Sequence, residues 1–549
     1  MLSSGPSLTI SSRLLFKFVL KIFYGSIVVE NSDLIPPDGQ PCIVCANHSN
    51  SLTDALCVRH AAVRHPTLST LTTVTPPKKR NLLRLTAKAT QFGKKTFTSW
   101  LIESAGTVPI KRRSDYSEDV QVDNTDVMSH LMDALELGDA VCLFPEGKSR
   151  YHPTMAPLKT GVARIVSDVL SRNRDDPDFA IYIQNCSITY THRQHWRSDV
   201  LVTYHPPMRF TPKDNPELLK PVDYANIRQL TENMHQQISQ GTVDAPSWEI
   251  LRSAKCAANI YAPLGTRMSL GDYVRLVKAY IDVFGLAYAP VLQGGDEGKD
   301  GASLREEDER IRRLCADLKV YQDQLVHLGA KDDRIRRPLN PYTVTYRMVI
   351  RLTWSLLLLS LSIPGLLLWF PVFLTTAYSV HNFKKSGPVW DTWDEIAQYK
   401  LIYGLMSGLC VWVGATLATL PFAGITFFAI PLLMWMTLRW LEDAIAAFRA
   451  FVSLLRLLCA GSTTLAKLGE TRKDLHERVR ELSMKYMQLP ENPEDHFSSS
   501  GGKHKGRVGS TAWESSTKYF SLRRRRKRDW NETLRLYDVV DFPQINSLD

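Results

Sequence analysis

A histidine and an aspartate with five residues between them, His48 and Asp54, stand in the polar segment Asn47-His48-Ser49-Asn50-Ser51-Leu52-Thr53-Asp54. A histidine that is mostly neutral near pH 7 can take the proton of a hydroxyl group that attacks a thioester. A carboxylate that accepts a hydrogen bond from the N–H of the other ring nitrogen fixes the tautomer and stabilises the imidazolium formed during the attack. The pair therefore predicts acyl transfer to a hydroxyl of the substrate, with no need for a serine of the enzyme.

The spacing of this pair restricts the local structure. On one continuous helix, six positions correspond to a rotation of about 240°, which would point the two side chains apart. His48 and Asp54 can therefore meet only if the histidine lies in a turn after a strand and the aspartate lies on the helix that follows. The apolar run 42–46 predicts that strand, and the Ser and Asn residues after His48 suit a turn and a helix start. Taken alone, a helix-capping segment with an incidental histidine explains the pair equally well.

Two further polar motifs follow predicted strands. One is Phe144-Pro145-Glu146-Gly147-Lys148-Ser149-Arg150, directly after the apolar run 141–143. The other, over 106–113, is a strand that ends in the three consecutive cations Lys111, Arg112 and Arg113. Arginine can hold a phosphate through two parallel hydrogen bonds, although a single basic cluster is more often a solvated surface. Three polar motifs at three strand ends predict one shared site for a phosphorylated acceptor.

Short apolar runs and helix-like segments alternate between residues 40 and 210. Strands are predicted at 41–46, 106–110, 141–144, 180–190 and 200–204, and helices at 127–137 and 158–170. This alternation favours an α/β domain with a mixed sheet and flanking helices, whose active site gathers at strand ends. We predict that the acyltransferase domain with its helical extension covers residues 31–290.

Two tracts without Asp, Glu, Lys or Arg, at 352–380 and 401–438, determine the physical class of the chain. A helix that spans a bilayer needs about 20 apolar residues, so residues 351–440 are predicted to be transmembrane or re-entrant segments. The second tract fits one long tilted span, two tight spans or a re-entrant hairpin. Arginines before the first tract and after the second favour an even number of crossings, with both large soluble parts in the cytosol.

The remaining segments are assigned from composition. Residues 1–30 predict an interfacial amphipathic helix, or equally an ordinary helix packed on the catalytic domain. Residues 291–302 read as a glycine-rich linker, 303–350 as a charged amphipathic helical region, 441–495 as a helical region and 496–549 as a disordered basic tail. The run Arg523-Arg524-Arg525-Arg526-Lys527-Arg528 in this tail predicts attraction to anionic headgroups of membrane lipids.

Charge and cysteines limit the partners. The formal net charge of +11 indicates an acidic partner, and beside two membrane tracts we expect lipid and phosphorylated substrate, with no nucleic acid. Cys42 and Cys45 form a C-x-x-C without a second pair or a histidine cluster, and they lie in the apolar run. We read them as small core residues and expect neither a metal site nor a cofactor.

The three ordered motifs together resemble the glycerolipid acyltransferase family, which includes glycerol-3-phosphate, dihydroxyacetone-phosphate and lysophosphatidate acyltransferases. The resemblance covers residues 40–210 and implies that His48 and Asp54 are the catalytic pair. It also implies a set of substrate-binding residues: Asn47, Gly106, Arg112, Glu146, Gly147, Ser149, Arg150 and Lys159. The five-residue spacing, and the hydrophobic tracts after the domain, are similar to a fungal subgroup that acylates glycerol 3-phosphate and dihydroxyacetone phosphate. Departures from the family pattern are Lys148-Ser149-Arg150 after Gly147 and Asn185 in the place of a proline, to which we assign no role.

The resemblance implies an enzyme of the endoplasmic reticulum membrane whose catalytic domain faces the cytosol. It would use acyl-CoA as co-substrate to esterify glycerol 3-phosphate, or also dihydroxyacetone phosphate, in the first step of glycerophospholipid synthesis. Two alternatives stay open. One is a lysophospholipid or lysophosphatidate acyltransferase, and the other is a catalytically silent scaffold that binds membrane lipid.

Overall fold

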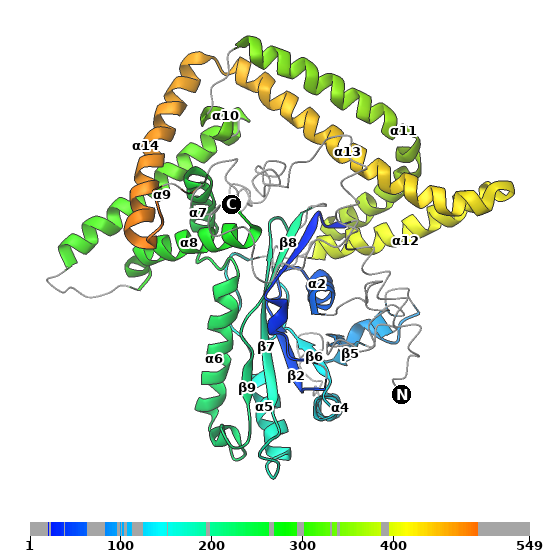
Figure 1. Cartoon of the computed structure of the whole chain (residues 1–549), viewed down its shortest axis with the longest axis vertical. Coiled ribbons are helices and arrows are strands. Elements are labelled where there is room, and N and C mark those ends of the chain that lie inside the picture. Colours follow the sequence, from blue (N-terminus) through cyan, green and yellow to red (C-terminus); the bar gives the residue numbers. More distant parts are fainter. Residues whose placement is uncertain are drawn as a thin grey trace. The chain divides into compact units, whose positions relative to one another are not determined.

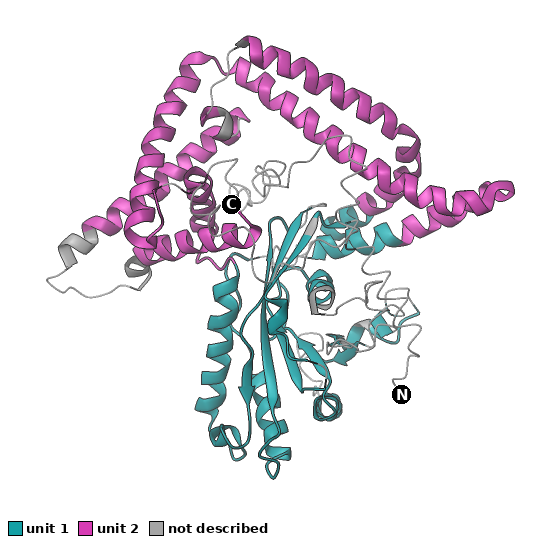
Figure 2. Ribbon diagram, in the orientation of Figure 1, with its two compact units in different colours: residues 1–242, 379–405, 505–508 teal, residues 243–378, 406–504, 509–549 magenta. Residues whose placement is uncertain are grey.

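The computed structural model describes residues 20, 23–37, 39–62, 83–95, 99, 102–103, 107–111, 124–150, 152–193, 198–262, 268–293, 301–329, 332–336, 341–385, 395–491 and 493. These residues form two compact units (Figure 2). The first, which we call the catalytic unit, contains the described residues up to 242 together with those within 379–405. The second, the helical unit, contains the described residues within 243–378 and from 406 onward.

A mixed sheet is the centre of the catalytic unit (Figure 1). Its strands run in the order β1-β8-β7-β2-β6-β3, and β9 also pairs with β7. Their bounds are Ser26–Glu30 (β1), Cys42–Ala46 (β2), Leu83–Arg84 (β3), Ala140–Leu143 (β6), Ile181–Tyr190 (β7), Asp199–Tyr204 (β8) and Met208–Phe210 (β9). A separate two-stranded sheet joins β4 (Thr86–Lys88) to β5 (Val108–Ile110).

Strand β2 lies in the middle and is parallel to both of its neighbours, β6 and β7. All five of its residues are buried, which accounts for the uninterrupted apolar run, because a central parallel strand is covered on both faces. Strand β7 pairs in the antiparallel sense with β8 and β9. The predicted α/β class with a mixed sheet is therefore confirmed, and strands lie at each of the five predicted places.

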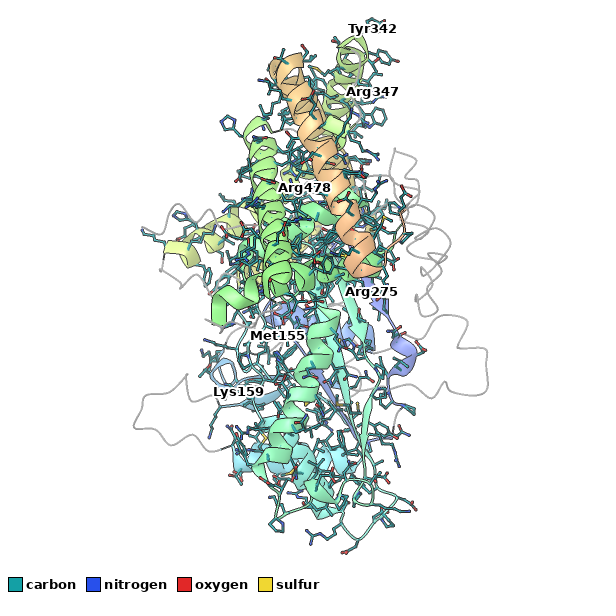
Figure 3. All side chains as sticks on the ribbon, turned by 90° about the vertical axis from the view of Figure 1, so that its left-hand side faces the viewer. Met155, Lys159, Arg275, Tyr342, Arg347 and Arg478 are labelled. Atoms are coloured by element: carbon teal, nitrogen blue, oxygen red, sulfur yellow. The ribbon has the colours of Figure 1, made fainter. Side chains whose placement is uncertain are left out.

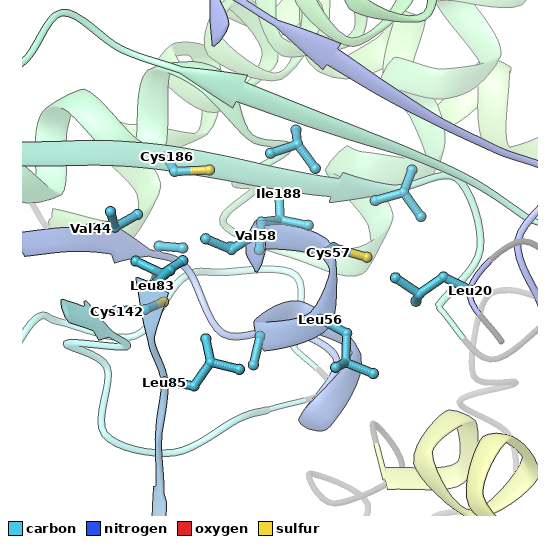
Figure 4. Close-up of a cluster of buried hydrophobic side chains, with 14 of the residues drawn as sticks. Leu20, Val44, Leu56, Cys57, Val58, Leu83, Leu85, Cys142, Cys186 and Ile188 are labelled. Atoms are coloured by element: carbon cyan, nitrogen blue, oxygen red, sulfur yellow. The ribbon is translucent and has the colours of Figure 1, made fainter. Parts of the chain in front are cut away.

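Helices cover both faces of the sheet. They are α2 (Leu52–Ala62), α4 (Thr125–Glu136), α5 (Gly161–Arg172) and α6 (Tyr224–Gly241). On one face, Leu56 and Val58 of α2 pack with strand residues such as Val44 and Ile188 (Figure 4). On the other face, α4, α5 and α6 bury a second apolar cluster that includes Val166. Because successive strand side chains point to opposite faces, the two clusters take alternate residues of β2.

The helical unit contains a group of packed helices: α7 (Trp248–Tyr261), α8 (Leu270–Gln293), α9 (Gly301–Leu328), α10 (Asp332–Arg336) and α14 (Ser462–Met487). The Tyr280 hydroxyl of α8 lies 2.6 Å from the Ser483 hydroxyl of α14. Arg472 of α14 donates two hydrogen bonds to Asp332 of α10, at 2.8 and 3.0 Å. Helices α7 and α8, which the sequence predicts as an extension of the acyltransferase domain, pack instead with α9 and α14 in the helical unit.

Three described helices are long and apolar enough to cross a membrane: α11 (Pro341–Lys385), α12 (Glu395–Ala418) and α13 (Ala423–Cys459). The second apolar tract is divided by the 3-10 turn Leu420–Phe422, so the option of one long tilted span is wrong. The preference for an even number of crossings stays a prediction. Three such helices satisfy it only if one of them enters the bilayer without traversing it.

Helices α11 and α13 pack closely within the helical unit. The Trp369 indole donates to the Met434 carbonyl at 2.8 Å, and a side chain at Gly365 would collide with Thr437. Small residues at such contacts allow the backbones of membrane helices to approach. Tyr342 and Arg347 lie near the start of α11, and Arg478 lies on α14 (Figure 3).

Several predicted segments fall outside the described residues. They include residues 1–19, the linker residues 294–300 and the basic tail from 494 onward. The last residues of the predicted N-terminal helix, Ser26–Glu30, instead form β1, which pairs in parallel with β8.

Candidate active site

Two predicted motifs meet at one edge of the sheet, because the carboxyl ends of parallel strands lie on the same side. Cys45 of β2 pairs with Leu143 of β6, and His48 and Glu146 follow these strands at the same offset of 98 residues. The His48 amide donates a hydrogen bond of 2.6 Å to Glu146 Oε1. The strand register therefore brings the first and third motifs into contact.

His48 and Asp54 form a hydrogen-bonded pair. Nδ1 of the imidazole lies 2.9 Å from Asp54 Oδ2. As the spacing requires, His48 lies in the turn after β2 and Asp54 lies in the first turn of α2. The Asp54 side chain is fully buried, whereas the His48 side chain keeps 18% of its surface exposed. The carboxylate is thus shielded from water while the imidazole remains accessible to a ligand.

Both carboxylate oxygens of Asp54 are held. Oδ2 also accepts the Asn50 amide at 2.7 Å, and Oδ1 accepts the Tyr190 hydroxyl at 2.6 Å. Burial, and then the negative charge of Asp54, raise the pKa of the Tyr190 phenol well above its ordinary value. Tyr190 therefore stays protonated and remains a donor. Such charge-assisted hydrogen bonds fix the carboxylate in the orientation that faces His48 Nδ1.

The other side of His48 is supported by the third motif. The imidazole stacks on Phe144, with ring centroids 4.3 Å apart and an angle of 23° between the planes. Glu146 accepts the His48 amide through Oε1 and the Ala156 amide at 3.1 Å through Oε2. Burial raises the pKa of Glu146, and these two hydrogen bonds oppose that shift. Glu146 thus braces the turn that carries the histidine.

We expect Glu146→Gln to lower kcat by about tenfold, because a glutamine side chain has one acceptor oxygen where two backbone amides must be satisfied. The KM for the acceptor should change by less than about twofold, because no substrate contact is removed. Steady-state kinetics test this, with exposed Glu232→Gln of α6 as the matched control. A large rise in acceptor KM at unchanged kcat would instead assign Glu146 to substrate binding.

The Asn47 side chain binds the backbone of the neighbouring strand β7. Its side-chain amide donates to the Ile188 carbonyl at 3.0 Å and accepts the Ile188 amide at 2.7 Å. Strand β2 pairs with β7 at an offset of 140 residues, as in Cys45 and Asn185, whereas the Asn47 side chain binds β7 at an offset of 141 residues, one position further along. The Asn47 side chain therefore anchors to β7 the segment 47–51 between β2 and α2, which we call the catalytic turn after its proposed role.

Other predicted residues surround the turn after β6. Gly147 has a φ of +76°, and an added Cβ there would lie 2.5 Å from the Lys159 ammonium nitrogen, so this cation covers the glycine. Figure 3 shows Lys159 and Met155 on the segment that precedes α5. The Arg150 amide donates to the His48 carbonyl at 3.3 Å, and Ser149 is half-buried beside it.

The second motif is described only in part. Gly106 and Arg112 lie outside the described residues. Val108 donates to the Leu85 carbonyl at 2.8 Å, and the Asn124 side chain binds both backbone polar groups of Lys111. Asn185, to which we assigned no role, donates to Gln237 of α6 at 2.6 Å. Within the described residues, no three His, Cys, Asp or Glu side chains gather as ligands for a metal ion.

Sequence reasoning missed Tyr190 and Asn50 as supports of Asp54. Asn50 stands between His48 and Asp54, but its backbone amide contact with Asp54 follows only from the folded turn. Tyr190 is 136 residues from Asp54, and its signal in the sequence is limited to its place at the end of a predicted strand.

Residues 26–189 match the model of the acyltransferase family, and residues 301–487 match that of the glycerol-3-phosphate acyltransferase 2 C-terminal domain. Over these two stretches the chain is similar to the glycerolipid acyltransferases. The first match contains both motifs that meet at the sheet edge, and the second runs from α9 to the last residue of α14. The family predicted from the motifs is therefore confirmed.

Two proteins with some similarity to the chain come from yeasts. An uncharacterised acyltransferase of Schizosaccharomyces pombe is 24% identical over 394 residues, which are 67% of this chain and 55% of that protein. Glycerol-3-phosphate O-acyltransferase 2 of Saccharomyces cerevisiae is 24% identical over 371 residues, 66% of this chain and 46% of the yeast protein. The chain thus spans about half the length of these relatives.

A solved structure with some similarity to the chain is the 1-acyl-sn-glycerophosphate (LPA) acyltransferase PlsC from Thermotoga maritima. It is 15% identical, with a TM-score of 0.25, over 42% of this chain and 80% of the bacterial one. Because that similarity is low, the fold assignment rests on the sheet and helices described above.

Proposed function

We propose that this chain transfers an acyl group from acyl-CoA to a hydroxyl of glycerol 3-phosphate. The observation that carries the proposal is the 2.9 Å contact between His48 Nδ1 and the fully buried Asp54 carboxylate, beside a partly exposed imidazole. Such a pair is a general base with a fixed tautomer. The name of the relative from Saccharomyces cerevisiae supports this acceptor.

In the proposed mechanism His48 Nε2 takes the proton of the acceptor hydroxyl while its oxygen attacks the thioester carbonyl. The Asp54 carboxylate stabilises the imidazolium that forms, because it accepts a hydrogen bond from Nδ1–H at 2.9 Å. When the tetrahedral intermediate collapses, the carbon–sulfur bond breaks. The CoA thiolate then takes the proton from Nε2, so that His48 returns to its neutral form.

The acceptor phosphate would bind beside the turn after β6. Lys159 covers Gly147 there and directly precedes the N-terminal end of α5, where backbone amides and the helix dipole favour an anion. Ser149 and Arg150 border the same turn. The family resemblance adds Gly106 and Arg112 from the second motif, and we keep both as proposed phosphate contacts, with Glu146 and Asn47 supporting the site.

Three apolar helices support membrane association. We propose that the protein resides in the endoplasmic reticulum membrane and that its catalytic edge faces the cytosol, where acyl-CoA is available. The basic segment 523–528 would add attraction to anionic lipid headgroups.

We expect the purified full-length protein, in detergent or liposomes, to acylate glycerol 3-phosphate with labelled acyl-CoA. Dihydroxyacetone phosphate, lysophosphatidate and unphosphorylated glycerol complete the panel, and chromatography identifies each labelled product. Glycerol itself should not react, because it offers no charge to the cations around Gly147. A higher kcat/KM for lysophosphatidate would support the lysophospholipid alternative. Absence of transfer to every phosphorylated acceptor would support the lipid-binding scaffold.

A further inference from the structure

The first turns of α12 belong to the catalytic unit, although they lie far from the motifs in the sequence. Ile396, Ala397 and Leu401 have at most 4% of their surface exposed, and the last two join the apolar cluster that contains Leu56 of α2. Beyond residue 405, large side chains of α12 such as Leu417 are exposed, with 63% of its surface open. One end of this apolar helix is therefore part of the core beneath the catalytic turn.

One side chain of this segment reaches the catalytic turn itself. The Ser51 hydroxyl donates a hydrogen bond of 2.8 Å to Gln398 Oε1 on α12. Ser51 lies between His48 and Asp54, and the Asp54 amide donates to its carbonyl at 3.2 Å. The contact therefore joins α12 to the short segment that connects His48 with Asp54.

Ser51 is also the place where this loop turns. Its φ is +49°, in the left-handed region that side chains other than glycine rarely adopt. Such a conformation persists where surrounding contacts over-determine it. On one side, the Asn50 side chain donates to the Arg193 carbonyl at 2.9 Å, and the Asn50 backbone amide donates to the Asp54 carboxylate. On the other side, Gln398 holds Ser51.

We infer that Gln398 is a positioning residue for acyl transfer, which acts through Ser51 on the geometry of the pair formed by His48 and Asp54. The inference rests on the proposed function of that pair. Without the acceptor oxygen of Gln398, the turn is held from one side and the Nδ1–Oδ2 contact is formed in a smaller fraction of molecules. The chemical step slows, while the groups that bind the acceptor and acyl-CoA stay in place.

The test compares Gln398→Met, which keeps the length of the side chain but lacks the acceptor, with Gln398→Glu, which keeps an acceptor oxygen. We expect Gln398→Met to lower kcat by about tenfold, because small displacements of reacting groups are costly in rate. The KM for both substrates should change by less than about twofold. Gln398→Glu should recover most of the lost kcat, and the exposed Gln236→Met of α6 should match the wild type.

A double-mutant cycle with Ser51→Ala separates the contact from general damage to the fold. If the two side chains act through one hydrogen bond, the double variant should have the same kcat as each single variant, so the two losses in kcat should not multiply. Multiplicative losses, or unchanged kcat in Gln398→Met, would overturn the inference.

Hydrogen exchange provides a readout that does not require catalysis. Amides of the segment 49–54 should exchange faster in Gln398→Met than in wild type or Gln236→Met, as mass spectrometry of the corresponding peptides can show. Faster exchange in Gln398→Met, combined with a wild type that shows no transfer activity, would refute the proposed function and leave the support of the turn intact. Equal exchange in all three proteins would overturn the inference itself.

Discussion

Replacing His48 with alanine is expected to lower kcat by about 10³-fold or more, since it removes the general base that takes the acceptor proton. Neither of the two described carboxylates beside His48 can take its place, because Asp54 is fully buried behind the ring and Glu146 is engaged by two backbone amides. The KM for acyl-CoA should change little, because the histidine acts on the hydroxyl in the transition state. Initial rates with labelled acyl-CoA and saturating glycerol 3-phosphate measure the loss.

The control for this prediction is His130→Ala on the exposed face of α4, which should keep the wild-type rate. The His48→Ala protein should still fold, because its backbone contacts to Glu146 and Arg150 do not need the imidazole. Its thermal midpoint in detergent and its recovery with membranes should therefore stay close to those of the wild type. Transfer at more than about a tenth of the wild-type rate would show that another group acts as the base.

Asp54→Asn is expected to reduce kcat by a similar factor, about 10³- to 10⁴-fold, for a different reason. The carboxylate accepts hydrogen bonds from His48 Nδ1, the Asn50 amide and the Tyr190 hydroxyl. An amide in the same place has one acceptor oxygen and presents N–H donors to the rest. Where an N–H faces His48, Nδ1 must accept, and the proton moves to Nε2, which then cannot act as a base.

This substitution should also lower stability, unlike His48→Ala. The buried donors that lose their acceptor cost about 1–3 kcal/mol each in the free energy of unfolding. A lower thermal midpoint in detergent, together with folded far-UV circular dichroism at 25 °C, is the expected result. Asp126→Asn at the exposed start of α4 is the control. An Asp54→Asn enzyme with normal kcat would exclude Asp54 from the mechanism.

The local part of the site could be predicted from the sequence. The apolar run before Asn47, the polar turn and the spacing to Asp54 predict a strand, a turn and a helix, because each depends on neighbours in the chain. The long tracts without charge likewise indicate membrane helices from composition alone. The break at Leu420–Phe422 depends on the local backbone conformation. The composition of the tract alone fits one long span, two tight spans and a re-entrant hairpin equally well.

The supports of the site could not be predicted in this way. Tyr190 lies 136 residues after its partner Asp54, and Gln398 lies 347 residues after its partner Ser51. Both contacts depend on how distant elements pack together. The resemblance places Glu146 among substrate-binding residues, while the structure shows its oxygens on the amides of His48 and Ala156. A motif in the sequence identifies a residue of the site, but it does not predict which groups the side chain contacts.

The contact between α12 and the catalytic turn has a consequence for biosynthesis. A ribosome makes the chain from its N-terminus, so β2, β6 and β7 emerge long before Gln398. Gln398 follows α11, the first of the apolar helices, and can reach Ser51 only after that helix has left the ribosome. Until then, the core beneath the turn lacks Ala397 and Leu401, and the turn lacks its contact with Gln398. We therefore expect the proposed transfer activity to appear only after the synthesis of α11, a helix long and apolar enough to cross a membrane.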